Sequence, residues 1–192
     1  YYYFVFTEAH HYKTKVLKAF LKVLEDFHDR FAFNFGALFP SGKSKGYTIS
    51  IKRVPKVINR HIDIVDYFVI LDFPCKEDDP PQVRDRKIRK TVEFAEKILD
   101  EINDYTKIVS VVQGISVDEV LFSYNLLREK GLVTWLIGIG SLGFNKRSAR
   151  ERLKVILPRI DHPRKHIFGL SHRALKDKTI DTTYICLLYT SD

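Results

Sequence analysis

Several kinds of residue are scarce in this sequence, and each shortage excludes a class of protein. The chain has no methionine, two cysteines, nine glycines and seven prolines among its 192 residues. Cys75 and Cys186 are too few for a disulfide framework or a Cys-x-x-Cys zinc site, and the low glycine and proline content excludes a collagen-like or low-complexity chain. The longest uncharged apolar runs, such as residues 132–144, fall short of the roughly 20 residues that a membrane span needs. We therefore expect a globular protein of the reducing cytoplasm that makes no contact with a membrane.

The ends of the sequence have features of a fragment. The chain begins Tyr-Tyr-Tyr inside a predicted strand, without a methionine, and residues 186–192 resemble translated sequencing adapter. We expect a single domain over residues 1–184 and a foreign tail over residues 185–192.

Short β-rich apolar runs alternate with longer amphipathic segments, a pattern typical of parallel βαβ units. We predict strands at residues 2–6, 31–35, 66–72, 107–112, 134–139, 166–170 and 179–184, and helices at 13–27, 48–60, 84–102, 148–157 and, after Ser116, up to Gly131. Ser116 and Glu119 are spaced as a capping box. Seven strands favour a (β/α)8 TIM barrel that is incomplete at its termini, since a whole barrel takes roughly 250 residues. A doubly wound sheet fits the same alternation, although no Gly-x-Gly-x-x-Gly follows the first strand.

Polar residues stand where the apolar strands end. Asp72, Gln113, Gly140 with Ser141, and Asp181 each close or follow such a run, and in a barrel these ends share one mouth. A carboxylate accepts the N1–H and N2–H₂ donors of guanine, and an amide donates to its O6 or N7. Asp72 and Gln113 therefore suit a guanine-like base, while a separate carboxylate such as Asp181 could attack a sugar C1′.

These segments resemble, in order and spacing, the tRNA-guanine transglycosylase superfamily, and they are most similar to its 7-deazaguanine DNA transglycosylase branch. The resemblance covers about residues 60–184 and rests on residues 66–75 (DYFVILDFPC), 111–114 (VVQG), 137–142 (IGIGSL), 166–170 (HIFGL) and 180–183 (IDTT). It implies a TIM barrel in which Asp72 and Gln113 read the base, Gly114, Gly140 and Ser141 lie at the substrate, and Asp181 is the nucleophile.

The sequence departs from the family at the general base. The family usually has Asp-Ser-Gly-[Ala/Gly]-Phe, whereas this chain has Asn34 in the nearest stretch, and an amide does not take up a proton near neutral pH. Either another acid serves, or the segment aligns differently, or the protein is impaired. We expect no cofactor in this chain; the zinc site of the tRNA-acting members would follow the nucleophile, beyond residue 192.

A net charge of +8 favours a polyanionic partner. We expect Arg86, Lys87, Lys146, Arg147 and Arg150, in the basic segments that follow Asp72 and Gly140, to contact phosphates. The predicted partners are DNA or tRNA and a 7-deazaguanine base, with a homodimer or a partner protein as a further option. The leading hypothesis is base exchange at guanine through a covalent Asp181 intermediate. A catalytically impaired guanine-binding or nucleic-acid-binding subunit and an unrelated small-molecule barrel enzyme remain alternatives.

Overall fold

The computed structural model describes residues 5–8, 31–34, 51–63, 65–141, 147–168 and 187–188. In these ranges the strands are β1 (Val5–Glu8), β2 (Phe31–Asn34), β3 (Tyr67–Val69), β4 (Ile108–Val112), β5 (Leu136–Ile139), β6 (Lys165–Ile167) and β7 (Leu187–Leu188). The helices are α2 (Val54–His61), α3 (Pro81–Leu99), α4 (Val117–Glu129) and α5 (Arg147–Ile156), with 3-10 turns at η2 (Ile51–Arg53) and η3 (Leu157–Arg159). None of these helices is long and apolar enough to cross a membrane.

The strands form one parallel sheet whose spatial order follows the sequence, from β1 to β7. A doubly wound sheet reverses its strand order at a switch point. The described strands show no such reversal, so the doubly wound alternative is wrong. The protein is a mixed α/β fold, and because every described strand is parallel, the carboxyl ends of all of them lie at one edge of the sheet.

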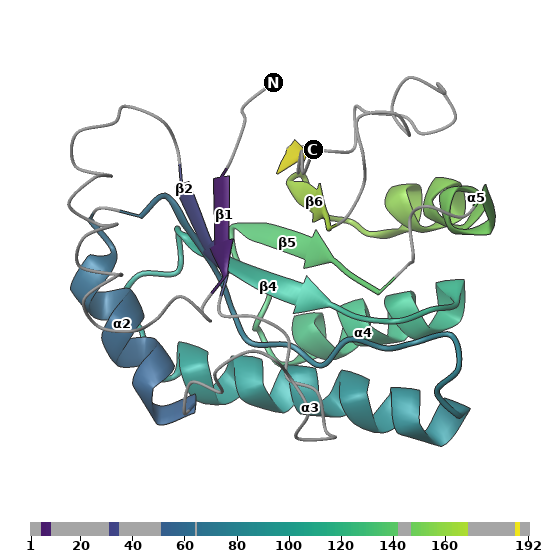
Figure 1. The fold of residues 1–192 in the computed structure, drawn as a ribbon, viewed down its shortest axis with the longest axis horizontal. Helices are drawn as coiled ribbons and strands as arrows, with labels where there is room; N and C mark the ends of the chain where they lie inside the picture. Colours follow the sequence, from purple (N-terminus) through teal and green to yellow (C-terminus); the bar gives the residue numbers. More distant parts are fainter. Residues whose placement is uncertain are drawn as a thin grey trace.

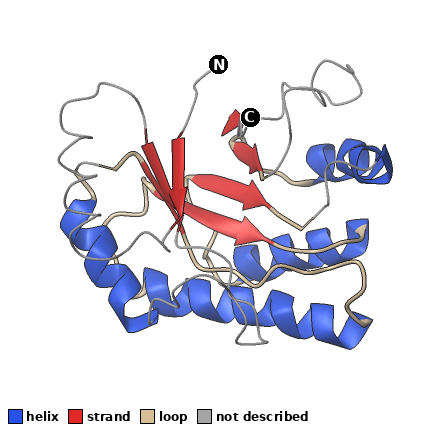
Figure 2. Cartoon of the chain, in the orientation of Figure 1, coloured by secondary structure: helices blue, strands red, loops and turns tan. Residues whose placement is uncertain are grey.

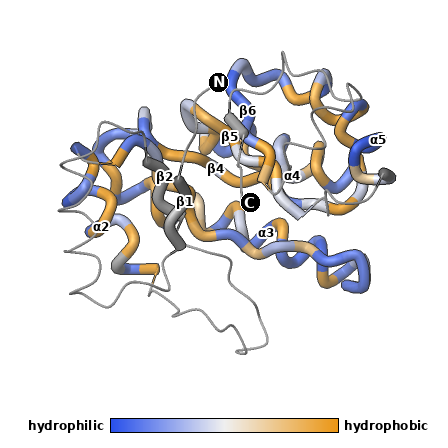
Figure 3. Tube along the Cα trace, turned by 45° about the horizontal axis from the view of Figure 1, so that its top comes forward, coloured by the Kyte–Doolittle hydropathy of each residue, from blue (hydrophilic) through white to orange (hydrophobic). Residues whose placement is uncertain are grey.

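The helices follow one another around the outside of a curled sheet (Figures 1 and 2). All residues of β4 and β5 are buried, and the colouring of Figure 3 shows these strands as hydrophobic. Strands covered on both faces have this near-continuous apolar character. Phe68, Ile108 and Ile137 are fully buried, and complete burial of each such side chain stabilises the fold by about 1.5–3 kcal/mol.

The predicted strands at 31–35, 66–72, 107–112, 134–139 and 166–170 are confirmed as β2 to β6, with shorter bounds in the structure. The helix predicted at 84–102 is α3, which begins three residues earlier because Pro81 suits a first helical turn. The helix predicted at 13–27 and the strand predicted at 179–184 lie outside the described residues. Leu187 and Leu188, which we expected to belong to a tail, pair with β6 as β7.

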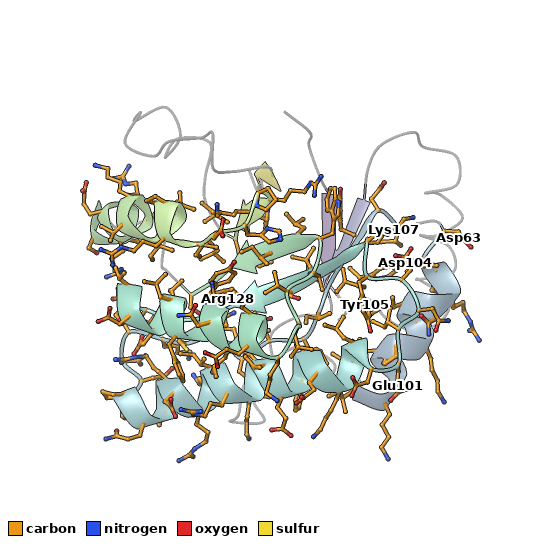
Figure 4. The ribbon with its side chains drawn as sticks, turned by 180° about the vertical axis from the view of Figure 1, so that it is seen from behind. Asp63, Glu101, Asp104, Tyr105, Lys107 and Arg128 are labelled. Carbon is orange, nitrogen blue, oxygen red and sulfur yellow. The ribbon has the colours of Figure 1, made fainter. Side chains whose placement is uncertain are left out.

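Two side chains just before β4 donate hydrogen bonds to backbone carbonyls near the carboxyl ends of α2 and α3. The Lys107 ammonium donates to the carbonyl of Ile62, and the Tyr105 hydroxyl donates to the carbonyl of Leu99 at 2.9 Å. Figure 4 shows Lys107, Tyr105 and Asp104 together near α2. These bonds stabilise the edge of the sheet opposite to the carboxyl ends described below.

The predicted capping box at the start of α4 is present. Ser116 Oγ accepts from the backbone N–H of Glu119 at 3.2 Å, and the Glu119 carboxylate accepts from the N–H of Ser116 at 3.1 Å. We predict that Ser116→Ala lowers the free energy of unfolding by about 1 kcal/mol. Urea denaturation measures the change, and Ser148→Ala on the exposed surface of α5 is the control. Equal stabilities for the two variants would contradict the prediction.

Candidate site at the carboxyl ends of the strands

Two polar side chains meet at the carboxyl ends of β3 and β4. Gln113 follows the last residue of β4, and Asp72 lies three residues beyond β3. The Gln113 Nε2 group donates a hydrogen bond to Asp72 Oδ2. Asp72 is 8% exposed and Gln113 is 2% exposed, so this carboxylate and amide contact each other inside the protein.

The end of β5 completes this cluster. The N–H of Gly140 donates to the carbonyl of Val112 at 2.9 Å, which places Gly140 beside Gln113 at the edge of the sheet. A Cβ atom on residue 140 would lie 2.7 Å from Gln113 Nε2. Only glycine therefore leaves room for the Gln113 amide to lie across the end of β5.

Ser141 links the cluster to the loop that follows β3. Its hydroxyl donates to Gln113 Oε1 and accepts from the backbone N–H of Cys75 at 2.8 Å. Ser141 has a φ of 63°, in the left-handed region that a residue other than glycine rarely adopts. The structure thus brings together four of the predicted site residues: Asp72, Gln113, Gly140 and Ser141.

Gly114 has a different environment from these four. A Cβ atom at this position would come within 2.7 Å of the backbone nitrogen of Val120 and 2.9 Å of Glu119 Cβ, in the first turn of α4. The close approach of α4 is sufficient to explain a glycine here. Its predicted contact with a substrate stays a prediction.

Burial changes the protonation of the Asp72 carboxyl group. Loss of solvation raises the pKa of Asp72 to about 7, although the hydrogen bonds from Gln113 and from its own backbone act in the opposite direction. Burial favours the neutral acid because a carboxylate is costly to remove from water. Near neutral pH the cluster therefore contains both the acid and the carboxylate form of Asp72.

The loop between β3 and α3 is fastened to α3 by contacts that the sequence did not predict. The N–H of Phe73 donates to Thr91 Oγ1 at 3.0 Å. The Lys87 ammonium donates to the carbonyl of Pro74 at 3.0 Å and to Asp79 Oδ2 at 2.5 Å. A threonine and a lysine inside an amphipathic helix give no sequence signal for such contacts, because the same residue types are common on helices where they face solvent.

These contacts correct the expectation for Lys87. Its side chain is 7% exposed and forms an ion pair with Asp79, so Lys87 fastens the loop instead of facing solvent as a phosphate contact would. Arg86, one residue before it, is exposed. Arg150 is half-buried, and Lys146 lies outside the described residues. Arg147 is described only as the first residue of α5, without its side chain.

Ion pairs also occupy much of the remaining positive charge in the two basic segments. Arg84 pairs with Glu119 at 2.7 Å, Arg89 pairs with Asp85 at 3.0 Å, and Arg152 of α5 lies 3.7 Å from Glu77 in the loop after β3. The contact between Arg152 and Glu77 places part of α5 near that loop. In the described residues these three basic side chains therefore have acidic partners, and the polyanionic partner stays a prediction.

Asp181, the predicted nucleophile, lies outside the described residues. Asn34 is the last residue of β2, at the same edge of the sheet as the cluster, and pairs in register with Val69. On its other side Asn34 is in register with Glu8, the last residue of β1. Glu8 was not among the predicted site residues, because the first strand was predicted to end at residue 6 and β1 ends at Glu8.

The described cluster has no feature of a metal or thiolate site. Within the described ranges, no three His, Cys, Asp or Glu side chains are grouped as metal ligands. Burial, followed by the nearby Glu119 carboxylate, raises the pKa of the Cys75 thiol to about 12, so this thiol stays protonated. The arrangement is instead one of hydrogen-bond donors and acceptors.

The raised pKa of Asp72 predicts a pH-dependent stability. Because the folded protein holds this proton more tightly than the unfolded chain, Asp72 stabilises the fold at low pH, and this contribution falls between about pH 4 and pH 7. Each unit of pKa shift corresponds to about 1.4 kcal/mol. Asp72→Asn should remove this dependence, since an amide keeps the shape and does not titrate.

Urea denaturation of both proteins at several pH values measures the effect. We expect the stability of the original protein relative to Asp72→Asn to decrease as pH rises over this interval. A constant difference would show that the pKa of Asp72 is the same in the folded and the unfolded protein. Asp118→Asn, on the exposed first turn of α4, is the control.

The comparisons with known proteins do not identify a family for this chain. Neither a protein-family model nor a curated protein matches the chain.

Proposed function

We propose that the protein is a nucleic-acid base-exchange transglycosylase that replaces guanine by a 7-deazaguanine derivative in DNA or tRNA. The observation that carries the proposal is the buried contact between the Asp72 carboxylate and the Gln113 amide, across the glycine at position 140. This contact gathers, at one edge of the sheet, side chains able to bind complementary atoms of a single guanine edge. The closed (β/α)8 barrel is part of the proposal, and the parallel sheet in sequence order is consistent with it.

The chemistry of the cluster favours guanine over other bases. An ionised Asp72 accepts hydrogen bonds from N1–H and the 2-amino group, while the second N–H of Gln113 Nε2 donates to O6. Both groups are buried, and an unmatched ligand atom there costs about 1–3 kcal/mol. A base with the opposite donor and acceptor order would leave two such atoms unmatched.

The proposed reaction requires a nucleophile and a proton acceptor in addition to this cluster. Asp181 is the proposed nucleophile: its carboxylate attacks C1′, the guanine leaves with the electrons of the glycosidic bond, and the incoming base then displaces the aspartate. Glu8 is the proposed proton acceptor, since its backbone lies beside Asn34 at the carboxyl end of β1. The basic side chains of α3 and α5 that face solvent would contact phosphates.

The amide at position 34 supports a second candidate function. If no carboxylate replaces the missing general base, the protein would bind guanine and nucleic acid without exchanging bases. The two functions share the Asp72 and Gln113 cluster and differ in the covalent step. An enzyme acting on a small molecule would instead bind no nucleic acid.

We predict that Asp72→Ala and Gln113→Ala each weaken the binding of guanine or 7-deazaguanine by about 1–3 kcal/mol, the usual loss for a good base contact. Isothermal titration calorimetry measures the affinities. Gln82→Ala, at an exposed position in the first turn of α3, is the matched control and should bind as the original protein does. Unchanged affinities in both cluster variants would remove guanine recognition from the proposal.

We predict that Asp181→Asn abolishes the covalent adduct with a guanine-containing oligonucleotide while noncovalent binding is retained, because an amide does not form the glycosyl ester. Denaturing electrophoresis with labelled oligonucleotide detects the adduct, and Asp161→Asn, at an exposed position, is the control. Original protein that binds the oligonucleotide without an adduct would favour the noncatalytic function. Adduct formation by Asp181→Asn would exclude this residue as the nucleophile.

A further inference from the structure

Three consecutive hydrogen bonds connect the loop after β3 to Asp72. The backbone N–H of Cys75 donates to Ser141 Oγ at 2.8 Å. The Ser141 hydroxyl donates to Gln113 Oε1, and Gln113 Nε2 donates to Asp72 Oδ2. In each of these bonds the donor belongs to the group nearer Cys75 and the acceptor to the group nearer Asp72, so all three bonds have the same direction.

Both ends of the series impose the same orientation on the Gln113 amide. A backbone N–H only donates, so Ser141 Oγ accepts at Cys75 and its own proton is available to an acceptor. The amide atom that receives this proton is the oxygen, Oε1. At the other end an ionised carboxylate only accepts, which requires the nitrogen of the same amide to face Asp72. Rotation of the amide by 180° would place two acceptors together beside Asp72.

The backbone at Ser141 is consistent with this role. A φ of 63° at a residue other than glycine costs on the order of 1–3 kcal/mol and is retained where the surroundings impose it. This conformation accompanies a side-chain hydroxyl that bridges the Cys75 N–H and the Gln113 carbonyl oxygen. Gly140, directly before it, leaves the space into which the oriented amide fits.

We propose that Ser141 is a positioning residue that fixes the orientation of the Gln113 amide and thereby selects a base edge with an acceptor at position 6, next to the N1–H that Asp72 accepts. The inference rests on the proposed function and reassigns Ser141 from substrate contact to specificity. With Nε2 held toward Asp72, its second N–H is a donor for O6. Without the Ser141 hydroxyl only Asp72 still orients the amide, so the amide turns more readily, and a turned amide presents an acceptor to a base that carries an amino group at position 6.

The test compares guanine with 2,6-diaminopurine, which differs from guanine only at position 6 and N1. The unprotonated N1 of 2,6-diaminopurine is equally unfavourable for ionised Asp72 in every variant, so a change in the affinity ratio between variants reports position 6. Ser141→Gly removes the hydroxyl, and glycine accepts the left-handed φ without strain. Calorimetry above about pH 8, where Asp72 with its pKa of about 7 is ionised, gives the ratio of the two affinities. We expect the original protein to prefer guanine, and Ser141→Gly to lower that preference about tenfold, as expected for the loss of one hydrogen bond.

Thr91→Val is the matched control. Thr91 accepts the N–H of Phe73 in the same loop and makes no described contact with Gln113, so its removal loosens the loop and should leave the ratio unchanged. Ser141→Ala is a second variant, and thermal unfolding confirms that each variant is folded. An unchanged ratio in folded Ser141→Gly or Ser141→Ala, or an equal decrease in Thr91→Val, would overturn the inference and leave the proposed function standing. Original protein that binds neither purine would contradict the proposed function and the inference together.

Discussion

The buried hydrogen bond between Asp72 and Gln113 is the constraint on which the rest of this edge depends. A carboxyl group and an amide removed from water need partners, because an unmatched polar atom in the interior is costly. Gly140 provides the space for the amide, Ser141 binds its oxygen, and the Ser123 hydroxyl of α4 accepts from the backbone N–H of Gln113 at 3.1 Å. Helix, loop and strand ends thus all contribute to holding one polar pair in place.

The sheet makes this convergence possible. The described strands are parallel and follow one another in sequence order. Asp72 and Gln113, which are 41 positions apart in the sequence, therefore come to the same edge of the sheet. The register between β4 and β5 pairs Val111 with Gly138 and Val112 with Ile139, which continues to Gln113 and Gly140. A one-residue slip would move a side chain to the opposite face of the sheet and would separate this glycine from the amide that it accommodates.

Much of this arrangement was accessible from the sequence because apolar runs mark buried parallel strands and the polar residue after each run marks its carboxyl end. The alternation of patterns predicted β2 to β6, and strand-end position singled out Asp72, Gln113, Gly140 and Ser141. Strand order was not accessible, since a doubly wound sheet has the same alternation. The ion pair of Lys87 with Asp79 was also inaccessible, because a lysine near the start of a basic helix has the same sequence pattern whether it faces solvent or the loop.

Three local costs coincide at this edge. The pKa of Asp72 is raised because the carboxylate is poorly solvated, Ser141 has a left-handed backbone, and Gln113 is almost completely buried. Apolar residues of similar volume at Asp72 and Gln113 would fill the same space without the cost of desolvating polar groups, and such replacements are often neutral or stabilising. Departures from local preference that gather in one place are expected at functional sites. The cost of this polar cluster to the fold therefore supports the proposed role in binding, and its donor and acceptor order is the basis for the proposed guanine ligand.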